Sequence, residues 1–214
     1  MKDNSEKILR LNNIVKSYQE KIVINKFSVE INYGESVGIF GKNGSGKSTL
    51  LKVCCGLLKP DSGIIEIMGK TFDSPEESLV IKSRMGVMMH EDMLYPQLSV
   101  KENWVFYSKI LGIKNINNII EEISSLLNIE KYLKTPVMEL SNGNKRKVSF
   151  GKSLLNEPDI LFVDEPESNI DDEGIEIISN IFNDRKKKGL ANLFSTHSEK
   201  FLNECSSQKI NLKF

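Results

Sequence analysis

The residues best suited to chemistry begin with a glycine-rich run at positions 41–48, GKNGSGKS, which fits the pattern GxxxxGK[ST]. The run lies between a short apolar segment, SVGIF (36–40), and a segment of helical character, TLLKVCCGLL (49–58). A strand, a glycine loop and a helix start in this order gather backbone N–H groups and the positive end of the helix around a phosphate. A flexible turn would explain the glycines but not this context, so the run predicts a site for nucleotide phosphates.

Each part of this loop has a predicted role. The glycines let the backbone close around the β-phosphate, Lys47 supplies charge to the β- and γ-phosphates, and the Ser48 hydroxyl ligates Mg²⁺. Thr49 is expected to add a bond to the α-phosphate. The predicted phosphate-binding residues are Gly41, Lys42, Asn43, Gly44, Ser45, Gly46, Lys47, Ser48 and Thr49.

A second motif, ILFVDEP (160–166), ends an apolar segment with two carboxylates. A carboxylate at the end of a buried strand is costly unless it meets a cation, so Asp164 is predicted to hold the Mg²⁺ shell. Because successive strand residues point to opposite sides, Glu165 can face the γ-phosphate and polarise the attacking water. Asp-Glu-Pro alone could be a simple turn. Together with the phosphate loop, it predicts nucleotide hydrolysis.

The order of apolar and polar segments around these motifs predicts an α/β fold. Segments 7–18 and 20–32 alternate apolar and polar residues around a turn, which predicts a pair of antiparallel strands. Further strands are predicted at 36–40, 63–69, 85–89, 160–164 and 190–196 and near 209–214, with helices over 49–58 and about 174–188. We therefore expect a mainly parallel sheet with helices on both faces.

The stretch from residue 99 to 156 has a helical period instead, including a helix after Asn144. We expect a single domain over residues 1–214. Residues 1–98 and 157–214 are predicted to form its nucleotide-binding core, and residues 99–156 an inserted helical subdomain.

Composition limits the partners. Lys and Arg total 29 and Asp and Glu total 29, so no summed positive field is present to attract nucleic acid, and no nucleic-acid partner is expected. Apolar runs are far shorter than the roughly 18 residues that span a bilayer, and the first residues are polar where a signal peptide needs apolar ones. The three cysteines have no disulfide or zinc spacing. The chain is expected to stay in the cytosol.

Taken in order, GKNGSGKST, LSNGN (140–144), ILFVDEP, SNID (168–171) and STHS (195–198) resemble the motifs of the ATP-binding domain of ATP-binding cassette (ABC) transporters. The resemblance covers essentially the whole chain. It implies a P-loop NTPase (RecA-like) fold with an N-terminal antiparallel β-subdomain and an inserted α-helical subdomain. It also implies that the ligands are ATP and Mg²⁺ and that ATP is hydrolysed.

Individual residues inherit expected roles from this resemblance. LSNGN stands where the family has its LSGGQ signature, which caps the ATP held by the opposite subunit, so Ser141 and Gly143 are expected to face that γ-phosphate. An ordinary helix N-cap would explain Ser141 but not its spacing to the acidic motif. Tyr18 corresponds to the aromatic that stacks on adenine, Asp171 to a contact with the opposite subunit, and His197 to the histidine that bonds the γ-phosphate. Alone, such a tyrosine or histidine is more often structural.

Two departures from the family pattern stand out. Asn142 and Asn144 replace the third and fifth signature residues. By its spacing to LYPQLSVKEN, His90 occupies the place of the family glutamine that reaches Mg²⁺, although imidazole suits Mg²⁺ poorly. A solvent-exposed loop histidine is the alternative for His90.

The resemblance implies a Mg²⁺-dependent ATPase at the cytoplasmic face of a membrane, held there by an integral membrane permease that it energises. It is expected to dimerise head to tail, as a homodimer or as a pseudo-dimer with another ATP-binding subunit. The stretch LYPQLSVKENWVFYSKILG (94–112) resembles the subgroup that serves small exporters, including haem-exporter and ABC-2 types. One alternative is a soluble ABC ATPase that acts on a protein partner. Another is a module that closes on ATP with little turnover, against which Glu165 argues.

Overall fold

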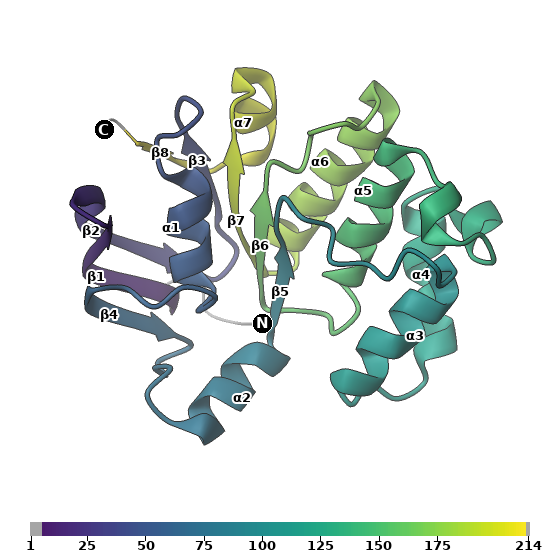
Figure 1. The fold of residues 1–214 in the computed structure, drawn as a ribbon, viewed down its shortest axis with the longest axis horizontal. Helices are drawn as coiled ribbons and strands as arrows, with labels where there is room; N and C mark the ends of the chain where they lie inside the picture. Colours follow the sequence, from purple (N-terminus) through teal and green to yellow (C-terminus); the bar gives the residue numbers. More distant parts are fainter. Residues whose placement is uncertain (1–5, 213–214) are drawn as a thin grey trace.

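Two β-sheets of different type share one hydrophobic core with helix α1 in the computed structural model, which describes residues 6–212 (Figure 1). The first sheet is antiparallel, has the order β2-β1-β4, and consists of β1 (Lys7–Tyr18), β2 (Lys21–Asn32) and β4 (Ser62–Ile67). The second is parallel, has the order β5-β6-β7-β3-β8, and consists of β3 (Ser36–Phe40), β5 (Met85–Met88), β6 (Ile160–Asp164), β7 (Ala191–Thr196) and β8 (Gln208–Asn211). The predicted α/β class is confirmed.

Several of the helices begin where a side chain caps the first turn. Ser99 and Glu102 form a reciprocal capping box at the start of α3, and Ser74 accepts from Glu77 N–H where Pro75 opens α2. The helices are α1 (Lys47–Cys54), α2 (Pro75–Ser83), α3 (Val100–Ile110), α4 (Ile116–Leu126), α5 (Asn142–Lys152), α6 (Asp172–Lys187) and α7 (Glu199–Cys205), with short 3-10 turns at η1 (Glu130–Tyr132) and η2 (Val137–Glu139).

Several elements differ from the sequence prediction. Strand β4 was expected within the β/α alternation, but it pairs antiparallel with β1. Helices α2 and α7 were not predicted. Helix α5 begins at Asn142, ahead of the predicted start after Asn144, because the Ser141 side chain caps it. The last predicted strand ends at Asn211 as β8, and its final positions, 213–214, lie outside the described residues. The predicted domain boundaries at 98 and 157 stay a prediction.

The parallel sheet brings the ends of three strands to one edge. Strand β7 lies between β6 and β3, and the terminal pairs are Asp164↔Ser195 and Phe40↔Thr196. The segments that follow β3, β6 and β7 therefore leave the sheet side by side (Figure 1). In open parallel sheets this carboxyl edge is where ligands bind.

The helical segment packs through the only tryptophan of the chain. Trp104 of α3 is fully buried, and its Nε1–H donates to Val148 O of α5 at 3.0 Å. Gly151, one helical turn further along α5, faces the same ring. A Cβ on Gly151 would lie 2.4 Å from Trp104 Cζ2, which is closer than non-bonded carbons can approach. Glycine is therefore required here by close packing of α5 on α3.

This contact predicts the sign of a substitution. An alanine in place of glycine normally stabilises a helix by about 1 kcal/mol. Here Gly151→Ala is expected to lower the free energy of unfolding by about 1–3 kcal/mol, because the tryptophan must move. Urea unfolding followed by Trp104 fluorescence measures this. Asn180→Ala, on the exposed side of α6, is the control and should change the free energy by less than about 0.5 kcal/mol. A Gly151→Ala protein at least as stable as the parent would contradict the packing argument.

Candidate active site

The glycine-rich loop carries a buried lysine at its centre. Lys47 is the first residue of α1 and is 5% exposed, and its Nζ donates to Gly41 O at 2.9 Å and to Lys42 O at 3.3 Å. The loop therefore orients its own cation. Helix α1 starts after Gly46 in a left-handed conformation, with φ of 90° and no side-chain cap on the first turn. N–H groups at such a helix start suit an anion.

The loop also carries a buried hydroxyl without a partner in the described part of the chain, and strand β2 packs against one of its glycines. The Ser45 Oγ is buried and has no hydrogen-bond partner among residues 6–212, as expected for a group that bonds something outside the chain. Strand β2 closes the other side, because a Cβ on Gly46 would lie 2.9 Å from Val23 Cγ1. Tyr18, half-exposed, ends β1 opposite Lys21, in the hairpin that leads to Val23. These features fit a nucleotide on the loop with Tyr18 near it.

The acidic motif ends β6 beside β7. Asp164 is 1% exposed, and its Oδ1 accepts from the Ser195 hydroxyl. The same hydroxyl accepts from Glu165 N–H at 3.1 Å, and the Ser195 carbonyl accepts from that N–H at 3.2 Å. Glu165 has φ of 48°, in the left-handed region that side chains other than glycine rarely adopt. Such a conformation is held only where its surroundings impose it.

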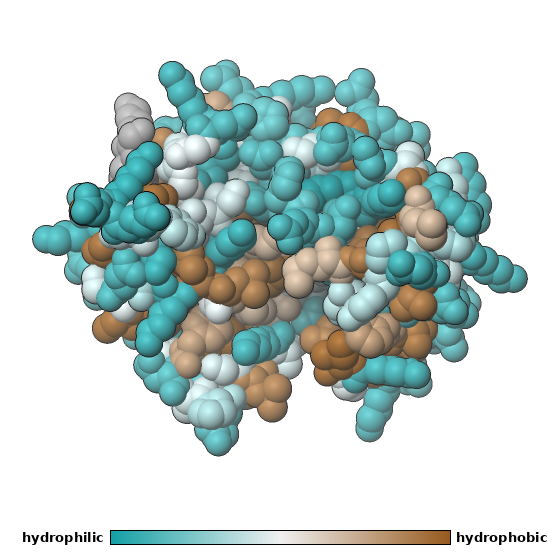
Figure 2. Space-filling view, viewed as in Figure 1, coloured by the Kyte–Doolittle hydropathy of each residue, from teal (hydrophilic) through white to brown (hydrophobic). Residues whose placement is uncertain are grey.

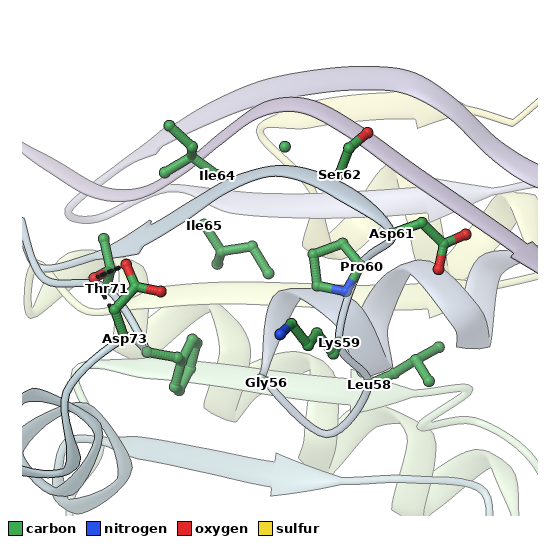
Figure 3. Close-up of a pocket in the computed structure, with 12 residues that line it drawn as sticks. Gly56, Leu58, Lys59, Pro60, Asp61, Ser62, Ile64, Ile65, Thr71 and Asp73 are labelled. Atoms are coloured by element: carbon green, nitrogen blue, oxygen red, sulfur yellow. Dashed lines mark hydrogen bonds between the residues drawn. The ribbon is translucent and has the colours of Figure 1, made fainter.

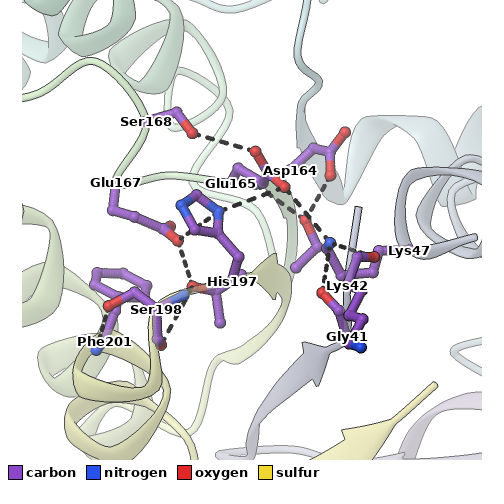
Figure 4. Close-up of polar contacts among 12 residues, drawn as sticks. Gly41, Lys42, Lys47, Asp164, Glu165, Glu167, Ser168, His197, Ser198 and Phe201 are labelled. Atoms are coloured by element: carbon purple, nitrogen blue, oxygen red, sulfur yellow. Dashed lines mark hydrogen bonds and ion pairs between the residues drawn. The ribbon is translucent and has the colours of Figure 1, made fainter. Parts of the chain in front are cut away.

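The structure brings Glu165 to the predicted lysine and histidine (Figure 4). Glu165 Oε1 lies 3.7 Å from Lys47 Nζ and 3.7 Å from His197 Nδ1, although these residues come from three separate segments. His197 is exposed and lies just past β7, and its Nδ1 is also 3.8 Å from Glu167 Oε1. A carboxylate, an ammonium and an imidazole therefore converge at the carboxyl edge of the sheet, where they can orient water and bind phosphate oxygens.

The donor set at this edge also bears on the metal. No group of three or more His, Cys, Asp or Glu side chains is placed to hold a metal ion in the part of the chain that the structure describes. Mg²⁺ usually takes one or two protein oxygens and completes its shell with waters and substrate phosphates. One buried carboxylate, Asp164, at the sheet edge beside the phosphate loop fits this mode. Ser48 follows Lys47 in α1 and is predicted as the second oxygen ligand.

The signature residues gather in a separate place. Ser141 caps α5, with its Oγ accepting from Asn144 N–H at 3.3 Å, and a Cβ on Gly143 would lie 2.9 Å from Asn169 O. Lys147 Nζ is 3.7 Å from Asp171 Oδ1. A polar cavity of about 460 Å³ is lined by Asn128, Lys131, Tyr132, Ser141, Gly143, Asn144, Lys147, Asn169, Asp171 and Glu173. No residue of the phosphate loop lines it, so the signature residues and the phosphate loop lie in separate places.

The structure gives Asp171 and Gly143 additional local roles. Asp171 Oδ1 accepts from Gly174 N–H at 3.0 Å and caps α6. Gly143 allows α5 to approach the Asn169 carbonyl. These contacts explain both residue types within one chain. The predicted contact of Asp171 with another subunit and of Gly143 with ATP stay predictions.

His90 is exposed in the segment after β5, and within residues 6–212 its side chain makes no hydrogen bond or ion pair with the converged side chains. Its carbonyl accepts from Arg146 Nη1 at 3.2 Å, and Arg146 Nη2 donates to Glu165 O at 3.0 Å. The predicted metal ligand is thus linked to the acidic motif through an arginine that sequence reasoning did not single out. Ser195 and Glu167 were also missed. Ser195 lies two residues before His197, and Glu167 lies two residues after Glu165. This closeness to predicted site residues is the sequence feature that could have indicated them.

Another cavity, of about 540 Å³, lies beside the turn after α1 and along β4 (Figure 3). Its lining includes Leu58, Pro60, Ile65 and Phe72, and Thr71 Oγ1 donates to Asp73 Oδ2 at its rim at 2.7 Å. None of the predicted site residues lines this cavity. It therefore has no part in the chemistry inferred from the motifs.

Comparison with known proteins agrees with the geometry. Residues 24–168 match the family model described as ABC transporter. The chain is 33% identical to the uncharacterized ABC transporter ATP-binding protein YcbN of Bacillus subtilis (strain 168), over 89% of this chain and 61% of that protein. It is 32% identical to the ABC transporter ATP-binding protein NatA of the same organism, over 84% of this chain and 74% of NatA. It is 31% identical to the Nod factor export ATP-binding protein I of Burkholderia orbicola (strain AU 1054), over 86% of this chain and 61% of that protein.

Solved structures give the same picture. A dimeric ATP-binding cassette in a post-hydrolysis state, bound to ADP and Pi, superimposes with a TM-score of 0.85 at 25% identity, over 96% of this chain and 94% of that one. The cbiO1 protein from Clostridium perfringens, part of the ABC transporter complex cbiONQ, superimposes with a TM-score of 0.83 at 25% identity, over 97% of this chain and 85% of cbiO1. The chain spans about 61% of the length of the first two relatives, YcbN and the Nod factor export protein.

Proposed function

Because the chain belongs to the ABC transporter family of ATP-binding proteins, we propose that it is a Mg²⁺-dependent ATPase that dimerises and energises a separate membrane permease, of the export type. The observation that carries this proposal is the convergence of Lys47, Glu165 and His197 at the carboxyl edge of the sheet. Fold likeness alone would not indicate the reaction, whereas this set of groups suits phosphoryl transfer to water.

The side chains divide the reaction between them. Lys47 places a fixed ammonium on the β- and γ-phosphates, and the α1 start donates N–H groups. Asp164 and Ser48 would hold Mg²⁺, which would supply positive charge to the phosphate oxygens. Glu165 takes a proton from the attacking water, and His197, beside it, donates a hydrogen bond to the γ-phosphate. The 3.7 Å separation of Glu165 Oε1 and Lys47 Nζ leaves both charges near one reacting centre.

The separation of the signature residues from the phosphate loop supports dimerisation. The polar cavity beside Ser141 and Gly143 is lined by the first residues of α5 and by Lys147. No residue of the phosphate loop of the same chain lines it. Two chains arranged head to tail would place this surface over the nucleotide of the other chain. The dimeric cassette among the similar structures supports this arrangement.

A permease partner is supported by the surface. No helix within residues 6–212 is both long and apolar enough to cross a membrane. Hydrophobic side chains gather over α2 and α3 on both sides of a hollow (Figure 2). Leu79 of α2 and Ile110 of α3 are exposed, as is Tyr95, whose ring packs edge-on against Phe106 at 4.8 Å. Apolar side chains in such a group favour a protein partner.

Export is proposed from the names of relatives, since several are export or resistance ATP-binding proteins. The finer expectation of a haem exporter stays a prediction. The alternative, a soluble ABC ATPase acting on a protein partner, shares every motif. Co-purification from detergent-solubilised membranes separates the two: a bound integral membrane protein whose presence raises the ATPase rate supports transport, and a soluble partner alone would favour the alternative.

His90 gives a prediction about the metal. If His90 serves the Mg²⁺ site as the family glutamine does, His90→Gln should keep or raise the ATPase rate. His90→Ala should raise the Mg²⁺ concentration for half-maximal rate by about tenfold, because no side chain is left to reach the metal shell. Steady-state phosphate release over a Mg²⁺ titration measures both. One Mg²⁺ curve shared by the parent and both variants would make His90 a bystander.

A further inference from the structure

Strands β5 and β6 part at the edge of the sheet, and a single side chain joins them there. Their ladder ends at the pair Met88↔Val163. Beyond it, Arg146 of α5 inserts its guanidinium between the two segments. Nη1 donates to Met89 O at 2.8 Å and to His90 O at 3.2 Å. Nη2 donates to the carbonyls of both residues of the acidic pair, with 3.0 Å to Glu165 O.

The burial of this arginine indicates that the contacts are needed. Arg146 is 4% exposed, and a buried guanidinium is costly unless its donors are satisfied. Nη1 and Nη2 are both bonded, whereas Nε has no hydrogen-bond partner within residues 6–212. Burial lowers the pKa of Arg146, while Asp92, whose Oδ1 is 3.6 Å from Nη1, opposes that shift. The guanidinium is planar, so its two terminal nitrogens fix the four carbonyls relative to one another. A lysine offers one nitrogen and cannot span both pairs.

The segment held on the β6 side contains the strained residue. Glu165 has φ of 48°, and its N–H is held by Ser195. Arg146 holds the carbonyl at the other end of the same residue. With both ends fixed, the direction in which the Glu165 side chain leaves the backbone is fixed as well. This direction brings Oε1 within 3.7 Å of Lys47 Nζ and of His197 Nδ1.

We infer that Arg146 is a positioning residue: it holds the backbone of Glu165 in its left-handed conformation and ties the acidic motif to the segment 89–92 that carries His90. Its kinetic consequence rests on the proposed ATPase function. The contact of Arg146 with both segments, the acidic motif and residues 89–92, does not depend on that function. It can be measured without nucleotide.

Helix α5 provides a matched control. Lys152, also a cation of α5, donates from Nζ to Asp92 O at 2.8 Å and to Met93 O at 3.4 Å. It lies over the Tyr107 ring, 4.9 Å from the centroid. Lys152 therefore holds the segment after β5 but makes none of the contacts to Asp164 and Glu165 that Arg146 makes. Lys152→Met removes one anchor of that segment without touching the acidic motif.

Hydrogen exchange of the nucleotide-free protein tests the joining. Arg146→Met should speed amide exchange by about tenfold both in residues 89–93 and in residues 164–168, because both lose the guanidinium. Lys152→Met should speed exchange only in residues 89–93. If Arg146→Met changes only one segment, or neither, the inference is wrong. Should Arg146→Met fail to fold, Arg146→Lys serves, with faster exchange expected in one or both segments and parental exchange in both contradicting the inference.

Kinetics test the positioning of Glu165. Arg146→Met should lower kcat about 10- to 100-fold, with ATP affinity changed less than about threefold and Lys152→Met near the parental rate. Arg146→Lys should keep an intermediate rate. In a Glu165→Gln background, Arg146→Met should lower the residual rate by less than about threefold, because the group it positions is already gone.

An equal fold-loss in both backgrounds, or a loss of ATP affinity as large as the loss of kcat, would overturn the positioning role. A different result would show that the proposed ATPase function itself is wrong. In that case Glu165→Gln alone would match the parent, while the exchange measurement would still decide whether Arg146 joins the two segments.

Discussion

Glu165→Gln is expected to bind ATP as tightly as the parent protein and to hydrolyse it about 10²- to 10⁴-fold more slowly, the usual loss when a general base is removed. The amide keeps the shape of the side chain but cannot accept a proton from water. The backbone contacts with Ser195 do not involve the carboxylate, so the site should stay assembled. ATP should therefore persist in a closed dimer, detectable as an ATP-dependent increase in mass by light scattering.

Glu167→Gln is the matched control, because the Glu167 carboxylate also lies near His197 Nδ1 but is buried and accepts a hydrogen bond from the Thr196 hydroxyl. Its loss of rate should be much smaller. A Glu165→Gln protein that hydrolyses ATP at the parental rate, or a Glu167→Gln protein with the same loss, would remove Glu165 from the role of base.

Lys47→Ala should weaken ATP binding about 10- to 100-fold, the cost of losing a strong charge-assisted contact, and should abolish measurable hydrolysis. The Lys47 ammonium is buried in the loop and oriented by the Gly41 and Lys42 carbonyls. Titration with a fluorescent ATP analogue measures the affinity.

Lys52→Ala, on the exposed side of the same helix, removes an equal charge without entering the loop. Lys52→Ala should leave the ATP affinity unchanged within about twofold, because salt screens the charge of an exposed side chain outside the loop. Unchanged affinity in Lys47→Ala, or an equal loss in Lys52→Ala, would argue that the loop is not the phosphate site.

The chemistry-bearing loop was predictable because its signal is local. A glycine pattern between an apolar strand and a helix fixes both the backbone shape and the place of Lys47. The buried strand that ends at Asp164, with Glu165 directly after it, was equally clear. That these two motifs meet depended on strand order, which puts β7 and then β3 beside β6 although they are distant in sequence. The family resemblance implied the fold, but the strand order itself comes from the structure.

Other features depend on tertiary contacts that no local pattern reports. Strand β4 has the same alternation in either sheet, and only its pairing with β1 makes it antiparallel. Helices α2 and α7 are short, nine and seven residues, and carry little periodic signal. Cavity-lining Lys131 and the packing reason for Gly151 also depend on neighbours remote in sequence.

Arg146 is the clearest example of a residue whose role the sequence alone does not predict. In KRKVSF it belongs to a basic run at the start of a helix, which normally indicates a solvated surface. Its burial follows from carbonyls of two strands that part beyond Met88↔Val163. Sequence alone does not show where ladders end, so the arginine that links His90 to Glu165 becomes visible only in the folded chain.

Phosphate release from ATP by the purified protein, measured across a wide range of protein concentration with and without Mg²⁺, tests the central claim most directly. The account predicts Mg²⁺-dependent release whose rate per chain rises with protein concentration, because each nucleotide needs the Ser141 surface of a second chain. Release that is independent of Mg²⁺, or a rate per chain that stays constant down to the highest dilution while light scattering shows monomers, would contradict it.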